Sequence, residues 1–174
     1  MVKDGYGMKK MFGVAFFLLV ATLSFAGNYA LVVGNDSYPN TPLQSPVNDA
    51  KEMYKKLNSL GFSSTLAINL DKKNTDECIL RFFASVGADD TVLLYYAGYA
   101  GEVLGMNYLL PVDFGANSGN NDIEASAINL NSVIDSLRKS RRFIVILDAA
   151  VESPFKTADV AMHGVNVIEM PKDG

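Results

Sequence analysis

Four short apolar runs, separated by longer stretches with helical spacing, constrain the fold of this chain more than any other feature. The runs are YALVVG (29–34), STLAINL (64–70), DTVLLYYAG (90–98) and RFIVILDA (142–149). Short, nearly continuous apolar runs are typical of strands buried on both faces, as in a parallel sheet. Strands that alternate with helices along a chain predict an α/β fold.

Apolar residues recur at helical spacing between these runs. We expect a first helix that contains Ala50 and Leu57, with Ser45 or Asn48 as its N-cap and Gly61 as its stop. The other predicted elements are a helix over 75–86, a short extended piece over 106–113, a loop over 115–122 and a helix over 130–137. Right-handed crossover connections then favour the strand order 2-1-3-4, with strands numbered along the chain.

The carboxyl ends of the predicted strands are the expected place for functional residues, because open α/β sheets bind ligands there. The residues at these ends are Asn35–Asp36, Gly98–Ala100 and Asp148–Ala150. We expect the third strand to stop at a Gly-x-x-Gly turn over 98–101, which would present Tyr99 to solvent. The predicted topology also brings Tyr99 and Ala150 close together, and we expect the Tyr99 hydroxyl to donate a hydrogen bond to Asp148.

The N-terminus has the layout of a secretory signal peptide. Lys9 and Lys10 precede an apolar run over 11–23, which is followed by the small-x-small site Ser24-Phe25-Ala26. The run is shorter than the ~20 residues that span a bilayer. We therefore expect residues 1–26 to be removed, residues 27–174 to form one domain, and the protein to be periplasmic or secreted. A retained membrane anchor is the alternative.

Composition excludes several classes of function. Residues 1–26 hold three of the 15 basic residues and one of the 19 acidic residues, so removing them leaves 12 basic and 18 acidic residues and a net charge near −6. A chain this acidic repels nucleic acid phosphates. The single Cys78 forms no internal disulfide, and neither metal-ligand spacing nor a phosphate-binding glycine loop is present. We expect no cofactor and no metal.

Three blocks of the sequence closely resemble the bacterial caspase-like, or metacaspase-type, cysteine peptidases over about residues 29–156. The blocks are ALVVGNDSYPNTPLQSPVNDAKEMYKKLNSLGF, YYAGYAGEVLGMNYLLPVD and VILDAAVESPF. The resemblance implies a caspase-like three-layer sandwich with a mostly parallel sheet. In this family the third strand ends in a Ser/Ala-Gly-His-Gly turn, whose histidine is the general base. The fourth strand ends in Asp-Ala-Cys, whose cysteine is the nucleophile.

The chain departs from the family at both catalytic positions. Tyr99 stands where the resemblance places the histidine, and Ala150 stands where it places the cysteine. In the oxyanion region, Gly98 is kept and the glycine after the histidine is Ala100. Cysteine peptidase chemistry needs a thiolate made available by a neighbouring imidazole. Alanine has no nucleophile, and a phenol with an ordinary pKa near ~10 is a poor base at neutral pH. We expect no peptidase activity.

No other residues are expected to rebuild the dyad. Ser153 follows Ala150 by three positions but has no assigned base. Cys78 lies in a predicted helix beside Phe82, as a buried structural thiol does. His163 is the only histidine, and it is expected to be a solvated loop residue.

Two acidic residues match a substrate pocket of the family. In relatives that cut after Arg or Lys, the pocket for the basic side chain uses an Asp in the NDA stretch and the Asp two before the cysteine. Asp49 and Asp148 stand at these positions. Two carboxylates that face one cavity can hold a guanidinium. The alternatives are a first-turn acid that favours the helix dipole, for Asp49, and a strand-end carboxylate bonded to loop amides, for Asp148.

The ending HGVNVIEMPKDG resembles the linker that leads into the small-subunit strands of this family. We therefore expect a large-subunit equivalent without those strands, whose fourth strand has a bare edge and promotes self-association or pairing with a partner strand. The favoured function is an exported, catalytically inactive caspase-like protein that binds a protein or a basic peptide. The alternatives are a cysteine endopeptidase of the caspase family, a non-functional fragment and a flavodoxin-like small-molecule binder.

Overall fold

The computed structural model describes residues 26–115 and 123–150 of the chain. Several sequence predictions fall outside these ranges: most of the signal peptide, most of the loop over 115–122, Ser153, His163 and the linker-like ending. Within the described ranges, no helix is long and apolar enough to cross a membrane.

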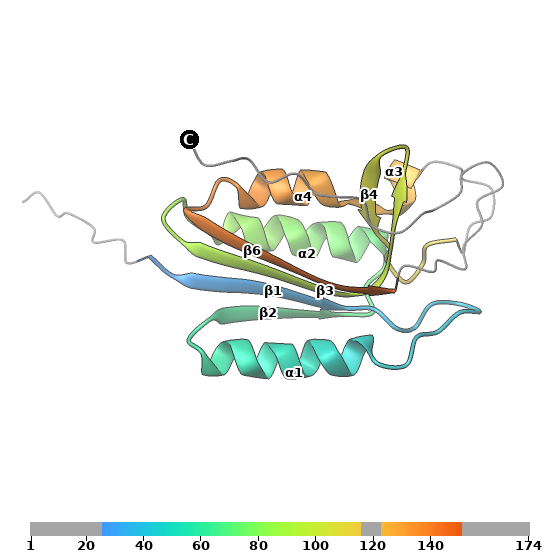
Figure 1. Ribbon diagram of the computed structural model, residues 1–174, viewed down its shortest axis with the longest axis horizontal. Coiled ribbons are helices and arrows are strands. Elements are labelled where there is room, and N and C mark those ends of the chain that lie inside the picture. Colours follow the sequence, from blue (N-terminus) through green and yellow to red (C-terminus); the bar gives the residue numbers. More distant parts are fainter. Residues whose placement is uncertain (1–25, 116–122, 151–174) are drawn as a thin grey trace, which may run out of the picture.

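A parallel sheet forms the centre of the molecule. Its strands are β1 (Asn28–Gly34), β2 (Ser63–Ile68), β3 (Thr91–Val103) and β6 (Arg142–Ala150). All neighbouring pairs run parallel, in the order β2-β1-β3-β6. This is the 2-1-3-4 order that the sequence predicts, and it places the carboxyl ends of β3 and β6 side by side (Figure 1).

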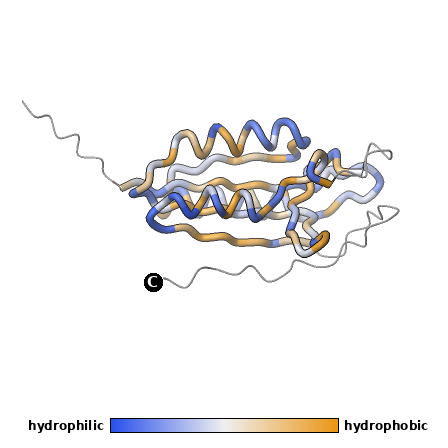
Figure 2. Tube along the Cα trace, turned by 90° about the horizontal axis from the view of Figure 1, so that it is seen from above, coloured by the Kyte–Doolittle hydropathy of each residue, from blue (hydrophilic) through white to orange (hydrophobic). Residues whose placement is uncertain are grey.

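Helices cover both faces of the sheet and complete a three-layer α/β sandwich, as expected (Figure 1). On one face, α1 (Pro46–Ser59) packs Ala50 and Leu57 against the side chains of β1 and β3. On the other face lie α2 (Lys72–Ala84) and α4 (Leu130–Leu137). Both faces of the central strands are therefore buried, which explains why their sequences are apolar without alternation (Figure 2).

The helix ends agree with the sequence in part. Ser45 occupies the N-cap of α1, although its side chain makes no capping hydrogen bond, and Gly61 follows the helix in a left-handed conformation with φ +87°. The second helix starts three residues before the predicted Thr75. Its N-cap is Asp71, whose carboxylate accepts a hydrogen bond from the Asn74 N–H at 2.7 Å.

The expected turn over 98–101 is wrong, because β3 continues without a break to Val103. Its first part lies between β1 and β6, and its last four residues pair antiparallel with β4 (Met106–Leu109). Leu104 and Gly105 connect the two strands, and both have positive φ, as in a tight hairpin turn. The hairpin rises from the sheet on the side of α2 and α4 (Figure 1).

The hairpin extends the sheet beyond the predicted elements. The two-residue strand β5 (Ile128–Asn129) pairs antiparallel with β4 and is preceded by the short helix α3 (Ile123–Ser126). The helix that follows, α4, covers the predicted range 130–137. Its Asn129 N-cap side chain accepts a hydrogen bond from the Ser132 N–H at 3.2 Å.

Candidate functional site

The two strand-end positions singled out in the sequence lie opposite each other. Tyr99 in β3 and Ala150 in β6 are register partners in the parallel ladder. Ala150 also packs against a buried cluster that contains Tyr99. The structure therefore brings together the two positions at which the resemblance places a histidine and a cysteine.

Tyr99 is buried rather than presented to solvent, with 7% of its surface exposed. Its ring packs edge-on against Tyr38, with ring centroids 4.8 Å apart and an interplanar angle of 64°. The cluster around it also holds Val103, Tyr108, Leu110, Phe114 and Ala127. Because β3 continues into a hairpin and the loop after β1 brings Tyr38 over it, the residue lies in a core.

Hydrogen bonds hold the main chain at Tyr99 from both sides. Its N–H donates to the Tyr38 hydroxyl oxygen at 3.0 Å. Its carbonyl oxygen accepts from the Tyr96 hydroxyl at 2.6 Å and from the Leu110 N–H at 3.0 Å. We call Tyr38, Tyr96 and Tyr99 the aromatic side of the site.

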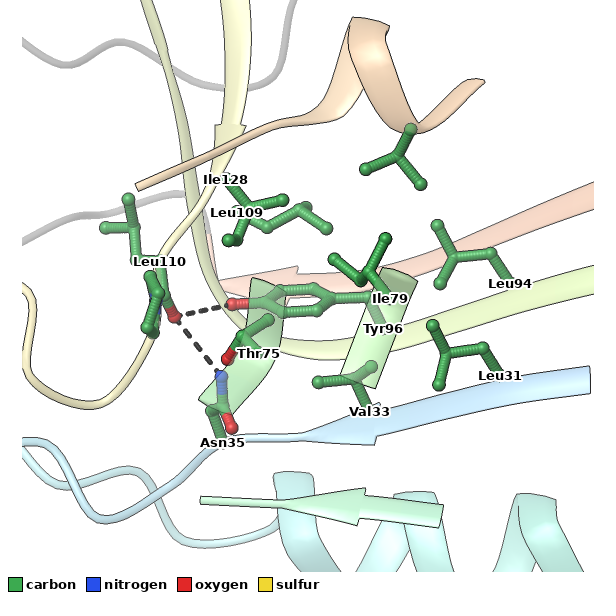
Figure 3. A pocket seen from close by; sticks show the side chains of 12 residues that line it. Leu31, Val33, Asn35, Thr75, Ile79, Leu94, Tyr96, Leu109, Leu110 and Ile128 are labelled. Atoms are coloured by element: carbon green, nitrogen blue, oxygen red, sulfur yellow. Dashed lines mark hydrogen bonds between the residues drawn. The ribbon is translucent and has the colours of Figure 1, made fainter. Parts of the chain in front are cut away.

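The carbonyl of Leu110 is the second anchor of the aromatic side. It accepts hydrogen bonds from the Tyr38 hydroxyl at 2.8 Å, the Tyr96 hydroxyl at 2.9 Å and the Asn35 amide at 3.3 Å, the last two of which are drawn in Figure 3. Burial raises the pKa of Tyr38 to about 12 and raises that of Tyr96 well above its ordinary value. Both phenols therefore stay protonated and act as donors at neutral pH.

A small cavity lies beside these bonds, between the sheet, α2 and β4 (Figure 3). Its walls are mostly apolar, and its free volume is about 10 Å³, roughly the space that one water molecule needs. The Asn35 side-chain oxygen, in its wall, has no hydrogen-bond partner among the described residues. The cavity suits a single water and is too small for a ligand.

The two residues of the expected oxyanion region are also enclosed. A Cβ atom added to Gly98 would lie 2.7 Å from the Tyr38 hydroxyl oxygen and 2.8 Å from that of Tyr96, so the close approach of these phenols requires glycine. Ala100 is 1% exposed and pairs with Leu109 in the hairpin. Both residues belong to a ladder rather than to an open turn.

The two carboxylates lie around a third tyrosine. The Tyr95 hydroxyl donates to the Asp148 carboxylate at 3.1 Å. Burial raises the pKa of Tyr95, and the negative charges of Asp148 and Asp49 raise it further. Asp148 is exposed at the end of β6, and Asp49 is half-buried in the first turn of α1. We call Asp49, Tyr95 and Asp148 the acidic side of the site.

The hydroxyl that reaches Asp148 belongs to Tyr95, whereas Tyr99 was the expected donor. Tyr95 and Asp148 lie on the face of the sheet that α1 covers in part, because Tyr95 packs in the same cluster as Ala50 of α1. Tyr99 follows the unusual backbone at Gly98, with φ +154°, and packs in a different cluster. The two sides therefore use separate tyrosines.

Cys78 lies on α2 and packs half-buried against the core between that helix and the sheet. Burial raises the pKa of its thiol, which disfavours the reactive thiolate. Within the part of the chain that the structure describes, no group of three His, Cys, Asp or Glu side chains can hold a metal ion.

The fold and the paired strand ends define a class: an α/β sandwich whose candidate site lies between two neighbouring parallel strands. A caspase domain model matches residues 28–171 of this chain. The chain therefore belongs to the caspase domain family. The match confirms the caspase-like part of the resemblance seen in the sequence.

Curated relatives match part of the chain. The human mucosa-associated lymphoid tissue lymphoma translocation protein 1 is 31% identical over 85 residues, which are 48% of this chain and 10% of that protein. Its mouse homologue is 32% identical over 85 residues, which again are 48% of this chain and 10% of that protein. The chain thus matches about a tenth of the length of these relatives.

Among solved structures, the chain is similar to protein GSU0716 from Geobacter sulfurreducens, with a TM-score of 0.47 and 15% sequence identity. The similarity covers 70% of this chain and 48% of that one.

Proposed function

We propose that this protein is a catalytically inactive member of the caspase domain family that acts by binding. The observation that carries the proposal is the pairing of Tyr99 with Ala150 at the ends of β3 and β6. In the family resemblance these are the positions of the general base and the nucleophile. A methyl group cannot attack a peptide carbonyl, and the phenol beside it is packed in a core.

Enzyme assays on the purified chain test the inactivity. We expect no turnover of fluorogenic peptides that end in Arg, Lys or Asp, with or without calcium. The assay includes variants Ser153→Ala and Cys78→Ser, which remove the other candidate nucleophiles. Turnover that survives both substitutions would contradict the proposal, and turnover that only Cys78→Ser removes would favour the alternative, a cysteine-type endopeptidase of the caspase family.

The acidic side is the proposed binding site, and its ligand is a basic peptide or a basic segment of a protein. Its support is that Asp148 accepts a hydrogen bond from the Tyr95 hydroxyl at 3.1 Å, and that the charge of Asp49, in another element, also raises the pKa of Tyr95. An exposed carboxylate, with a second one whose charge also acts on Tyr95, suits the planar, doubly donating guanidinium of arginine. Two charge-assisted contacts at ~1.5–3 kcal/mol each, less the cost of ordering the peptide, correspond to millimolar to high-micromolar affinity.

Titration with an Arg-containing peptide, followed by nuclear magnetic resonance, tests this site. We expect saturable shifts at the amides around Asp49 and Asp148. A matched peptide with citrulline in place of arginine keeps the shape and removes the charge, so it should bind at least several-fold more weakly. Equal shifts with both peptides, or no shifts at millimolar peptide, would contradict the proposed binding site. They would favour the alternative that the chain is a non-functional fragment.

We further propose that the protein is exported and loses residues 1–26. Lys9 and Lys10, the apolar run and the Ser-Phe-Ala site support this proposal. Mass spectrometry of the protein from the envelope fraction should find Gly27 at the N-terminus. Intact peptides from residues 11–23 in the membrane fraction would instead show a retained anchor.

A further inference from the structure

A buried carboxylate lies where β1, β3 and β6 begin, at the opposite end of the sheet from Tyr99 (Figure 1). It belongs to Asp90, the residue before β3, which is 8% exposed. One carboxylate oxygen accepts a hydrogen bond from the Gly27 N–H and the other accepts one from the Gly87 N–H, each at 2.6 Å. No cation among the described residues pairs with this carboxylate. Neutral donors alone hold it, although burying a charge is costly unless the charge is paired.

The strand itself fixes the position of the Gly27 nitrogen. The Gly27 carbonyl accepts a hydrogen bond from the Thr91 N–H at 2.9 Å, and the next residue, Asn28, is the register partner of Thr91. A Cβ atom added to Gly27 would lie 2.5 Å from ring carbon Cε2 of Tyr29, so the close approach of this ring favours glycine. The nitrogen is therefore held against Asp90 by contacts on its C-terminal side.

Gly27 is also the residue that follows the Ser24-Phe25-Ala26 site. We propose that removal of residues 1–26 turns the Gly27 nitrogen into an α-ammonium group that pairs with Asp90 and stabilises the processed chain. This inference rests on the processing proposed above. In the cleavage, the Ala26–Gly27 amide bond is hydrolysed. The oxygen of water joins the Ala26 carboxylate, and both protons of that water end on the Gly27 nitrogen.

Cleavage changes the charge of the donor and leaves its position unchanged. An α-amino group has an ordinary pKa near 8 and is mostly protonated at neutral pH. A hydrogen bond between two charged groups is roughly twice as strong as one between neutral groups. The precursor has an amide N–H at the same place and lacks this gain. The processed chain is therefore the more stable form, and the precursor is the easier one to unfold for export.

The alternative role of Asp90 is to close the turn between α2 and β3. Its own N–H donates to the Gly87 carbonyl at 3.3 Å, in addition to the bond that its side chain accepts from the Gly87 N–H. In that role, a charge on the Gly27 nitrogen adds no stability. The two roles thus differ in one measurable quantity, which is the effect of the α-ammonium charge on unfolding.

Urea denaturation of two forms of the processed chain measures this effect. Every described helix and strand follows Gly27, so a chain that starts there contains the whole described fold. One form has a free α-amino group, and the other is acetylated at that group, which restores the amide N–H and removes the charge. At pH 6.5, we expect the free form to have an about five- to tenfold higher ratio of folded to unfolded chain. Equal ratios would overturn the ion pair.

Substitution of the carboxylate tests the partner. With Asp90→Asn, acetylation should change the ratio less than about twofold, because the charge has no partner left. Asp89→Asn is the matched control, since Asp89 is the neighbouring carboxylate and is exposed. It should keep the whole difference between the free and acetylated forms. A difference that persists with Asp90→Asn would assign the charge effect to other residues and overturn the proposal.

Titration of the α-amino group by nuclear magnetic resonance needs no variant. The carboxylate should raise the pKa of the Gly27 α-ammonium above its ordinary value near 8. The difference between the free and acetylated forms is then complete below about pH 8 and is lost as the pH rises through the raised pKa. The neighbouring titratable groups are Tyr29 on β1, Asp89 in the turn, and Arg141 and Arg142 at the start of β6, and both forms share them. An ordinary pKa would overturn the ion pair.

The N-terminus of the protein in the envelope fraction separates the two proposals. A start at Gly27 together with equal stability of the free and acetylated forms would overturn the ion pair alone. A start at another residue would overturn the proposed cleavage, and with it the role of the ion pair in the processed protein. A start at Gly27 with the expected loss on acetylation supports both.

Discussion

The aromatic side and the acidic side of the site flank the same pair of strand ends but differ in their access to solvent. Tyr38, Tyr96 and Tyr99 are all less than a tenth exposed and bond to main-chain groups. On the acidic side, Asp148 is exposed and bonds to a side chain. The aromatic side is part of the core, whereas the acidic side holds a charged group exposed to solvent.

The contrast separates a part of the site that supports the fold from a part that solvent reaches. At position 99, a large ring fills the space between the hairpin and the loop after β1, so that this position now contributes to stability. Asp148 contributes little to the core, because a carboxylate with that exposure is solvated by water. Substitutions on the aromatic side should therefore change folding, and substitutions on the acidic side should change binding.

The largest expected effect is that of Tyr99→Ala. Removing a buried aromatic ring leaves a cavity, and such truncations cost about 3–5 kcal/mol of unfolding free energy. Urea denaturation followed by circular dichroism measures it. Asp148→Ala is the control and should change stability by about 0.5 kcal/mol or less. Similar losses for both variants would contradict the division of the site into a core side and a solvent side.

The second-largest expected effect is a loss of unfolding free energy at high pH, caused by the aromatic side. Burial holds the pKa of Tyr38 at about 12 in the folded state, whereas an exposed phenol in the unfolded chain titrates near 10. The unfolded state therefore loses its proton first. The stabilisation is complete below pH ~10 and is lost as the pH rises to ~12, by up to about 1.4 kcal/mol per pH unit.

Denaturation curves between pH 9 and 12 measure this loss, and Tyr38→Phe provides the comparison. The variant lacks the titrating hydroxyl, so its stability should depend less steeply on pH over the same range. An unchanged slope would mean that Tyr38 ionises freely in the folded protein. That result would contradict the conclusion that the aromatic side is buried away from solvent.

A smaller effect is expected for Asp148→Asn. The variant keeps the shape and removes one negative charge, so an Arg-containing peptide should bind about three- to tenfold more weakly, or about 1 kcal/mol. Asp89→Asn is the matched control, since Asp89 is an exposed carboxylate that precedes β3 at the opposite end of the sheet. Stability should stay within about 0.5 kcal/mol in both variants.

The smallest expected effect is the recovery of activity in Tyr99→His/Ala150→Cys. The double variant restores the two residue types of the family, but the imidazole would lie under Tyr38 and within the apolar cluster. We expect no cleavage of Arg-ending peptides above background. Robust Arg-specific cleavage would show that the aromatic side still opens to substrate, while it would support the assignment of the two positions.

The sequence predicts the parallel sheet well because its evidence is local. Each buried strand is an apolar run, α4 has clear helical spacing, and crossover handedness limits the order. The sequence does not predict the hairpin, because its glycines indicate a turn at a different place. Gly98 and Gly101 suggest a turn, and the real turn uses Leu104 at φ +52°, where Asn or Asp is the usual signal. Pairing with β4 overrides the local preference.

The roles of Tyr38 and Tyr95 were not predictable from sequence spacing. Tyr38 lies in a loop rich in Pro and Asn, and its contact with Tyr99 depends on how that loop folds over the hairpin. Tyr95 and Tyr96 are neighbours in one strand, so alternation assigns them to opposite faces. The sequence does not say which face holds the carboxylates. The positions of Asp49 and Asp148 came from the family resemblance.

The hydrogen bonds that hold position 99 have a consequence for the evolution of this site. The bonds described from Tyr38, Tyr96 and Leu110 reach its backbone N–H and carbonyl, which every residue except proline possesses. These hydrogen bonds therefore hold the backbone at position 99 in the same way whichever side chain it carries. A lineage can exchange that side chain, and with it the chemistry, while its descendants inherit an unchanged scaffold.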